Sequence, residues 1–444
     1  MNAREVLRIP DYRRIWVAQT ISDFGDGLTN LALLIVVNAL TGSTAAIALM
    51  AIAIAIPPMT IGLVAGVYVD RLDRRRVMLA SDLLRAGLVL GLVLVRSADQ
   101  LPLLYALAFL EASVGTFFHP ARSALVPAIV PEDGLLAANG VSQASRVIAS
   151  TAGAAAAGVL LGVAGTATPA FVVDSATFLV SFAIILGVRA RPAPILPPSG
   201  SHAGIGLAFR EGIATVARSR VLVGVLVAAA VLMLGLGAVN VLFIPLLRND
   251  LGVPVTWLGA VDIAQTSSMV LSAGLVGVLA ARLRPTSIVT ATLAGLAGLI
   301  CLVAFVTQVW QVILLLFLAG WLITPLNAAI MTLVQTESPP DRIGRVDATL
   351  NAALSGASIA SMAAAGVLGT LIGVRETFLL AGLIAGLSAV VALVLFRGTA
   401  AAGAPSPAVP EGEPTSSAAG LSPVPVPVEP SDRYTGAQGE APRA

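Results

Sequence analysis

The chain has 444 residues, of which 57% are hydrophobic and only 11% are charged, and its formal net charge is +2. Soluble domains carry about 25% charged residues, so this composition excludes a soluble globular protein. Every basic residue is an arginine, and without lysine neither a Walker A nucleotide loop nor Schiff-base catalysis is available.

The remaining composition argues against an enzyme. The single cysteine, Cys301, excludes an intramolecular disulfide and a cysteine-based metal site. The sequence has no visible Ser-His-Asp, metal-binding or phosphate-binding constellation. We therefore expect no enzymatic activity, no cofactor, no metal and no nucleic-acid partner.

Long apolar runs recur along the whole chain. Each has roughly 20 residues, enough to cross a hydrocarbon core of about 30 Å as a helix. The first eleven residues are polar and lack the features of a cleavable signal peptide, so the first run is expected to be a retained helix. The runs predict an all-α polytopic membrane protein with twelve spans, over residues 14–40, 45–69, 77–96, 101–124, 138–163, 168–188, 221–247, 254–281, 286–306, 310–333, 345–372 and 376–396.

The arginines alternate from one connector to the next. The N-terminus and every second connector are rich in arginine, whereas the other connectors offer only Arg96, Arg248 and Arg375. By the positive-inside rule, the arginine-rich connectors and both termini are cytoplasmic. The sequence thus predicts a multi-pass protein of the cell inner membrane.

The second half of the chain repeats the first. The hexapeptide Ala155–Leu160 recurs unchanged as Ala363–Leu368, and the same offset of 363 − 155 = 208 residues matches Phe109 with Phe317 and Pro131 with Pro339. The offset spans six predicted helices, an even number, so both halves have the same orientation.

This repeat defines the expected domains. Residues 1–188 form an N-terminal six-helix half and residues 221–397 a C-terminal one. Residues 189–220 form a cytoplasmic linker, in which the segment 206–218 is amphipathic and suited to the membrane surface. Residues 398–444 are rich in proline, alanine and serine and are predicted to be a disordered cytoplasmic tail.

The most charged stretch follows the second predicted span. It contains Gly66, Asp70, Arg71, Arg74 and Arg75 between two apolar runs. We expect a cytoplasmic gate here, in which Asp70 latches onto a helix of the other half and the arginines shape the opening. The alternative is that the arginines only fix the loop inside the cell.

This stretch and the twelve spans in parallel halves resemble the major facilitator superfamily. The family pattern in this loop is roughly G-x-x-x-D-R-x-G-R-R, and this chain departs from it at Asp73, where many members have glycine. The segments 70–86, 118–127 and 171–178 are similar to a branch of efflux proteins that includes macrolide and multidrug exporters and the enterobactin-exporter group. The resemblance covers about residues 10–397.

Six charged residues lie well inside the predicted spans. Each would cost about 2.5–3.5 kcal/mol at the bilayer centre, so they must face the bundle interior, form pairs or become neutral. They are Asp23, Asp26, Glu111, Arg146, Asp174 and Asp262.

Three of the carboxylates are expected to meet. Asp23 and Asp26 share one face of the first span, and Glu111 reaches a similar depth on the fourth. The resemblance implies that these spans line a central cavity, where Asp26 and Glu111, and less so Asp23, would couple to protons or substrate. The alternative is that they only brace the helices through hydrogen bonds.

Other polar groups are assigned to the same cavity. Arg146 is expected to be the counter-ion of Glu111 or Asp26, or else a static brace. For Asp174 a structural contact is favoured over a role in transport. For Asp262 a structural role and a role in transport are both left open. In the second half Asn240, Trp321 and Asn327 are expected to line the cavity.

The resemblance predicts a secondary active transporter. The expected activity is proton-coupled export of an amphipathic, drug-like small molecule by alternating access, by a monomer in the lipid bilayer. The alternatives are a siderophore or lysolipid carrier, an importer, or a non-transporting receptor or scaffold. Burial of several carboxylates argues against a scaffold, which has no need of them.

Overall fold

The computed structural model describes residues 1–69, 72–189, 205–339 and 342–397, and every element in these ranges is helical. The first bundle of long helices follows one short helix. These elements are α1 (Ala3–Arg8), α2 (Pro10–Thr41), α3 (Thr44–Val69), α4 (Arg74–Gly91), α5 (Leu101–Leu125), α6 (Leu135–Ala164) and α7 (Thr168–Leu186). The later elements are α8 (Ile205–Arg218), α9 (Arg220–Pro245), α10 (Leu258–Arg282), α11 (Pro285–Val303), α12 (Val309–Glu337), α13 (Ile343–Leu371) and α14 (Val374–Phe396).

Short helical turns complete the connectors. They are the 3₁₀ turns η1 (Leu92–Leu94), η2 (Ala98–Gln100), η3 (Val126–Ala128), η4 (Glu132–Gly134) and η6 (Val255–Trp257), and the π-helical turn η5 (Leu246–Asp250). The unpredicted helix α1 forms because Asn2 and Glu5 make a reciprocal capping box at its start.

Eleven helices of the described ranges are long and apolar enough to cross a membrane. The prediction of a polytopic α-helical membrane protein is therefore confirmed. The expected eighth span, 254–281, corresponds to α10 (Leu258–Arg282), which is not among the eleven. The total of twelve spans thus stays a prediction.

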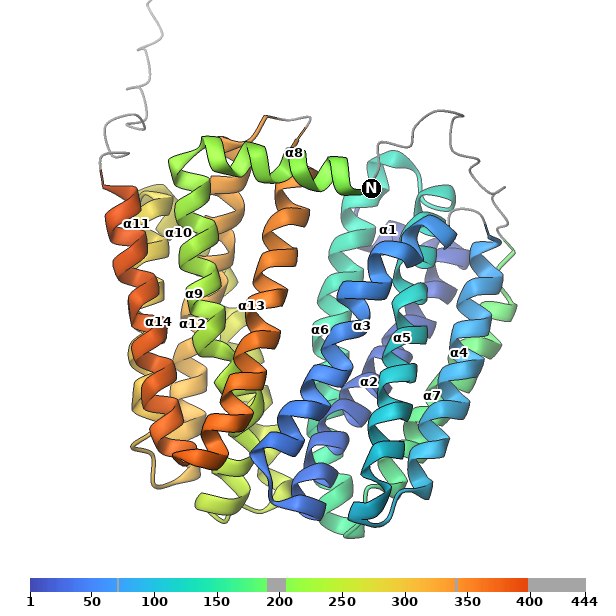
Figure 1. Ribbon diagram of the computed structural model, residues 1–444. Coiled ribbons are helices and arrows are strands. Elements are labelled where there is room, and N and C mark those ends of the chain that lie inside the picture. Colours follow the sequence, from blue (N-terminus) through green and yellow to red (C-terminus); the bar gives the residue numbers. More distant parts are fainter. Residues whose placement is uncertain (70–71, 190–204, 340–341, 398–444) are drawn as a thin grey trace, which may run out of the picture. The chain divides into compact units, whose positions relative to one another are not determined.

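The long helices pack in two sets with equivalent partners (Figure 1). In the first set α2 packs on α6 and α7, α4 on α5 and α7, and α3 on α5. In the second set α9 packs on α13 and α14, α11 on α12 and α14, and α10 on α12. Each helix thus has a counterpart in the other set, as the 208-residue repeat predicts.

Glycines bring α2 and α6 into backbone contact. A Cβ at Gly27 would overlap the carbonyl group of Ser150 on α6, and one at Gly153 would overlap the carbonyl group of Phe24 on α2. Only glycine fits at such close approaches. Two of the helices that carry the polar groups described below are therefore held close together.

The two sets contact each other through equivalent helices as well. The two contacts are equivalent, because α3 packs on α13, and their counterparts α10 and α6 pack on each other. At one end Asn38 and Asn249 exchange amide hydrogen bonds of 3.1 and 3.2 Å. The Thr44 hydroxyl donates to the Gly366 carbonyl at 2.9 Å near the same end.

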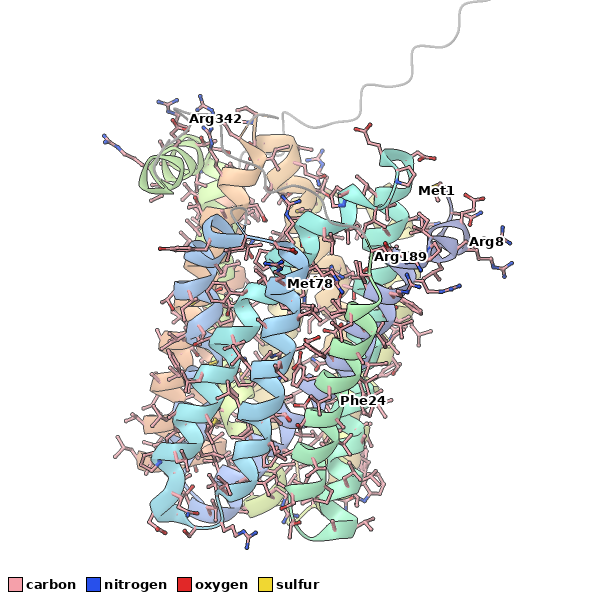
Figure 2. All side chains as sticks on the ribbon, turned by 90° about the vertical axis from the view of Figure 1, so that its right-hand side faces the viewer. Met1, Arg8, Phe24, Met78, Arg189 and Arg342 are labelled. Carbon is pink, nitrogen blue, oxygen red and sulfur yellow. The ribbon has the colours of Figure 1, made fainter. Side chains whose placement is uncertain are left out.

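Basic residues gather at the opposite end. Figure 2 shows Arg8, Arg189 and Arg342 there, while Phe24 lies midway along the bundle. The amphipathic helix predicted in the linker is present as α8, and it is tied to α13 by an ion pair between Glu211 and Arg345. The predicted disordered tail, 398–444, lies outside the described residues.

Candidate functional site

A cavity of about 910 Å³ lies between the two sets of helices. Its polar lining comes mostly from α2, α4, α5 and α6, and one wall comes from α13. The charged or titratable lining residues are Asp23, Asp26, Arg85, Glu111, His119 and Arg146. Ligand sites typically have volumes of about 300–1,000 Å³, so the cavity can hold a small organic molecule.

An arginine flanked by two carboxylates forms the centre of this lining. Arg85 on α4 donates from Nε to Glu111 Oε1 on α5 at 2.7 Å, and its Nη2 forms an ion pair with Asp26 on α2. The Arg85 side chain is only 9% exposed, against 28% for Asp26 and 13% for Glu111. Three helices thus meet at one guanidinium group, and the three groups together carry a formal charge of −1.

An aromatic ring packs against the guanidinium group of Arg85. The Arg85 Cζ atom lies 4.2 Å from the centroid of Phe178 on α7, a distance at which a cation is attracted to the ring face. On the same helix, the buried Asp174 accepts a hydrogen bond of 2.5 Å from Thr29 on α2. Asp174 is therefore used in packing α7 against α2.

Asp23 lies one helical turn before Asp26 and lines the same cavity. It is 6% exposed, and its Oδ2 atom has no hydrogen-bond partner among the described residues. The nearby amide of Gln19 accepts a hydrogen bond from Arg122. The Oδ2 atom of Asp23 is thus a buried acceptor without a donor among the described residues.

Arg146 does not have the expected role of counter-ion. Its side chain lines the cavity, but in the described ranges it forms no ion pair, and Arg85 pairs with both Asp26 and Glu111 instead. The reason is geometric, because α4 and α5 are direct neighbours and place Arg85 beside Glu111. Arg146 is exposed in the cavity wall, where none of the described carboxylates forms an ion pair with it.

The wall contributed by α13 carries no charge. It consists of small and amide side chains together with one isoleucine, namely Ala348, Asn351, Ala352, Ser355, Ser358 and Ile359. Among the described residues, the formal charges that line the cavity therefore all belong to the first set of helices. A ligand held there would meet charged groups on one side and neutral ones on the other.

A second cavity, of about 390 Å³, adjoins the first. Gly27, Asn30 and Ser150 line both. Asn240, which was expected to face the central cavity, lines this second one, together with Asp262. Its lining comes from α2, α6, α9, α10 and α12.

Two expected lining residues lie elsewhere. Neither Trp321 nor Asn327 lines either of these two cavities. The Trp321 ring contacts Phe317, with centroids 6.5 Å apart, and its carbonyl accepts a hydrogen bond from Ser272. Both residues are on α12, whose Leu316 does reach the second cavity.

The charged turn is described only in part. Asp70 and Arg71 lie outside the described residues, and Gly66 is in α3. Asp73 caps α4 by accepting from the Arg76 amide, which explains why aspartate is accommodated at this position. Arg74 is 4% exposed, and Arg75 donates to the carbonyl groups of Ile185 and Leu186.

Sequence reasoning missed Arg85. The sequence predicts Arg146 as the deep cation of this half, and Arg85 lies within the segment 70–86 that is similar to known exporters. One signal was available, because Asp82 and Arg85 lie three residues apart in an otherwise apolar run and so share a helix face. Asp82 is fully buried and accepts a hydrogen bond of 2.6 Å from Ser181.

The sequence matches the profile of a family described as transmembrane secretion effectors, over residues 3–418. It is 29% identical over 377 residues to the MFS-type transporter YfiS of Bacillus subtilis (strain 168), covering 82% of this chain and 88% of that protein. It is 25% identical over 381 residues to macrolide efflux protein A of Streptococcus pyogenes, covering 83% of this chain and 91% of the relative.

The fold is also similar to solved structures. A crystal structure of a mutant of the nucleoside transporter NupG superposes with a TM-score of 0.72 over 88% of this chain and 100% of that one. The sequence identity is 13%, so this likeness concerns the fold alone.

Proposed function

Since the chain belongs to the transmembrane secretion effector family of major facilitator transporters, we propose that it is a proton-coupled exporter of an amphipathic small molecule. Members of this family are membrane transporters and not enzymes. The observation that carries the proposal is the cluster of Asp26, Arg85 and Glu111 in the wall of the larger cavity.

The charge of this cluster supports exchange of a proton for substrate. Two carboxylates and one guanidinium group leave a formal charge of −1 at a site where charge is costly. One proton on Asp26 or Glu111 would make the cluster neutral. Binding and release of that proton changes the charge of a cluster that joins α2, α4 and α5, and so can bias how these helices pack.

The cavity supports an amphipathic substrate. Besides the charged groups, the lining includes the apolar residues Ile54, Ala55, Pro58 and Met59 of α3. An apolar wall beside a few polar groups is typical of small-molecule sites. The relative named macrolide efflux protein A favours export, and a drug-like compound is the substrate class that we propose.

The distribution of arginines supports an orientation in the membrane. We place the end with Arg8, Arg189 and Arg342 (Figure 2) in the cytoplasm of the cell, following the positive-inside rule. Both termini are then cytoplasmic, in a monomer of the inner membrane. Residues 1–188 and 221–397 would be the two halves that move relative to each other, joined by the linker 189–220.

The test is efflux of ethidium from energised cells and from proteoliposomes, with and without a protonophore. The wild type should lose efflux when the proton gradient is collapsed. Asp26→Asn and Glu111→Gln should each lower proton-driven efflux at least tenfold, whereas Asp99→Asn, which removes an exposed carboxylate in η2, should not. Efflux that persists without a gradient would refute proton coupling, and full activity of both neutralised variants would refute the assignment of the cluster.

A further inference from the structure

The carboxylate of Asp262 has no partner in the described part of the chain. It forms no hydrogen bond or ion pair there, and no charged side chain is near enough to act on it. It is partly buried on α10 and lines the second cavity. This is a different situation from Asp26 and Glu111, which both contact Arg85.

The second cavity otherwise has a neutral lining. Its apolar members are Leu31, Leu34, Ala154, Val239, Phe243, Ile244 and Leu316. Its other polar members are Asn30, Ser150, Thr151, Asn240, Gln265 and Thr266. No arginine or histidine is among the lining residues, so Asp262 is the one formal charge that the described lining presents.

The two cavities follow each other along the helices. On α2 the larger cavity extends from Asp23 to Asn30, and the second continues to Leu34. On α6 the larger cavity contacts Arg146 and the second extends to Ala154. The shift has the same direction on both helices, away from the arginine-rich end, so the second cavity lies next to the first and deeper in the bundle.

We propose that the second cavity is a binding compartment for lipophilic cations, in which Asp262 is the counter-ion of the cationic group. An unpaired carboxylate among apolar walls costs free energy when empty, and a bound cation removes that cost. The Phe243 ring adds a surface to which a cation is attracted, and the aliphatic residues accept the apolar body. The inference names a substrate class for the transport cycle proposed above and rests on it.

A matched pair of ligands tests the role of the charge. Tetraphenylphosphonium is a fixed cation with aromatic rings, and triphenylphosphine oxide has similar rings without the charge. We expect Asp262→Asn to raise the Kd of purified protein for tetraphenylphosphonium at least tenfold and to change that for triphenylphosphine oxide less than twofold. Asp262→Glu should restore cation binding, and Asp99→Asn should bind both ligands like the wild type.

A second measurement needs no variant. Dicyclohexylcarbodiimide modifies carboxylic acids in apolar surroundings, and mass spectrometry locates the product. Tetraphenylphosphonium should protect Asp262 of the wild type from modification, and triphenylphosphine oxide should protect it less. Unchanged modification, or unchanged cation affinity of Asp262→Asn, would overturn the inference.

Efflux separates this inference from the proposed function. If Asp262→Asn loses proton-driven export of neutral and cationic substrates alike, Asp262 belongs to the coupling machinery and the inference is overturned, while proton-coupled export stands. If wild-type efflux is insensitive to a protonophore, proton coupling fails, whereas the binding and protection results still decide the role of Asp262.

Discussion

Replacing Arg85 by methionine gives the most direct test of the charge cluster. The substitution keeps much of the aliphatic stem but leaves Asp26 and Glu111 without the cation that they share. Removing one partner of a buried ion pair costs about 3–5 kcal/mol. Because Asp26 is 28% and Glu111 13% exposed to the cavity, solvent screens part of this cost, and we expect the lower end of the range, about 3 kcal/mol.

The assay is thermal unfolding of the purified protein in detergent, followed by tryptophan fluorescence. A loss of about 3 kcal/mol corresponds to a decrease in Tm of roughly 3–4 °C for a chain of this length. The deficit should shrink as the pH is lowered, because protons can then neutralise the carboxylates in place of Arg85. The triple variant Arg85→Met/Asp26→Asn/Glu111→Gln should recover most of the stability, since it has no uncompensated charge.

Two outcomes would refute this reasoning. The first is an Arg85→Met protein that is as stable as the wild type at neutral pH. The second is a triple variant that is less stable than the single variant. Either result would mean that the three groups are not energetically coupled and that Arg85 has another role.

Two further predictions concern packing. Gly153→Val should destabilise the protein by about 1–3 kcal/mol in the same thermal assay, because the valine side chain would overlap the backbone of α2. Gly140→Val on the same helix is the control, since its side chain would face open space and should be tolerated better. Equal effects of the two substitutions would argue against the close contact between α2 and α6. Arg75→Ala should lower the Tm measurably, because two carbonyl groups at the end of α7 lose their hydrogen-bond donor. Arg76→Ala should not lower it, since the Arg76 side chain is 83% exposed. An unchanged Tm of Arg75→Ala would show that solvent replaces the contact.

The fold could be predicted from the sequence because its main signal is local. A run of roughly 20 apolar residues in a membrane protein has few alternatives to a spanning helix, and each expected span corresponds to a helix of the structure. The short helix α1 was missed because six residues carry little periodicity. Its capping pair, Asn2 and Glu5, was the available signal.

The site was predicted less completely because it depends on rotation and contact between helices. Counting depth along two helices gave Asp26 and Glu111 a similar level, the family resemblance placed both helices at a central cavity, and both residues line it. Counting depth does not tell which arginine lies between the two carboxylates. In the structure Arg85 forms the ion pairs with Asp26 and Glu111 that were expected of Arg146. The same limit applies to Trp321, whose ring contacts Phe317 on its own helix.

The amide pair of Asn38 and Asn249 has an electrical consequence. Moving one elementary charge across 100 mV is worth about 2.3 kcal/mol, but separating two neutral amides moves no formal charge. The membrane voltage therefore does not directly change the free energy of separating these two amides. Asn38 and Asp26 are both on α2, 12 residues and about 18 Å apart, so a movement of α2 along its axis would act on the amide pair as well as on Asp26.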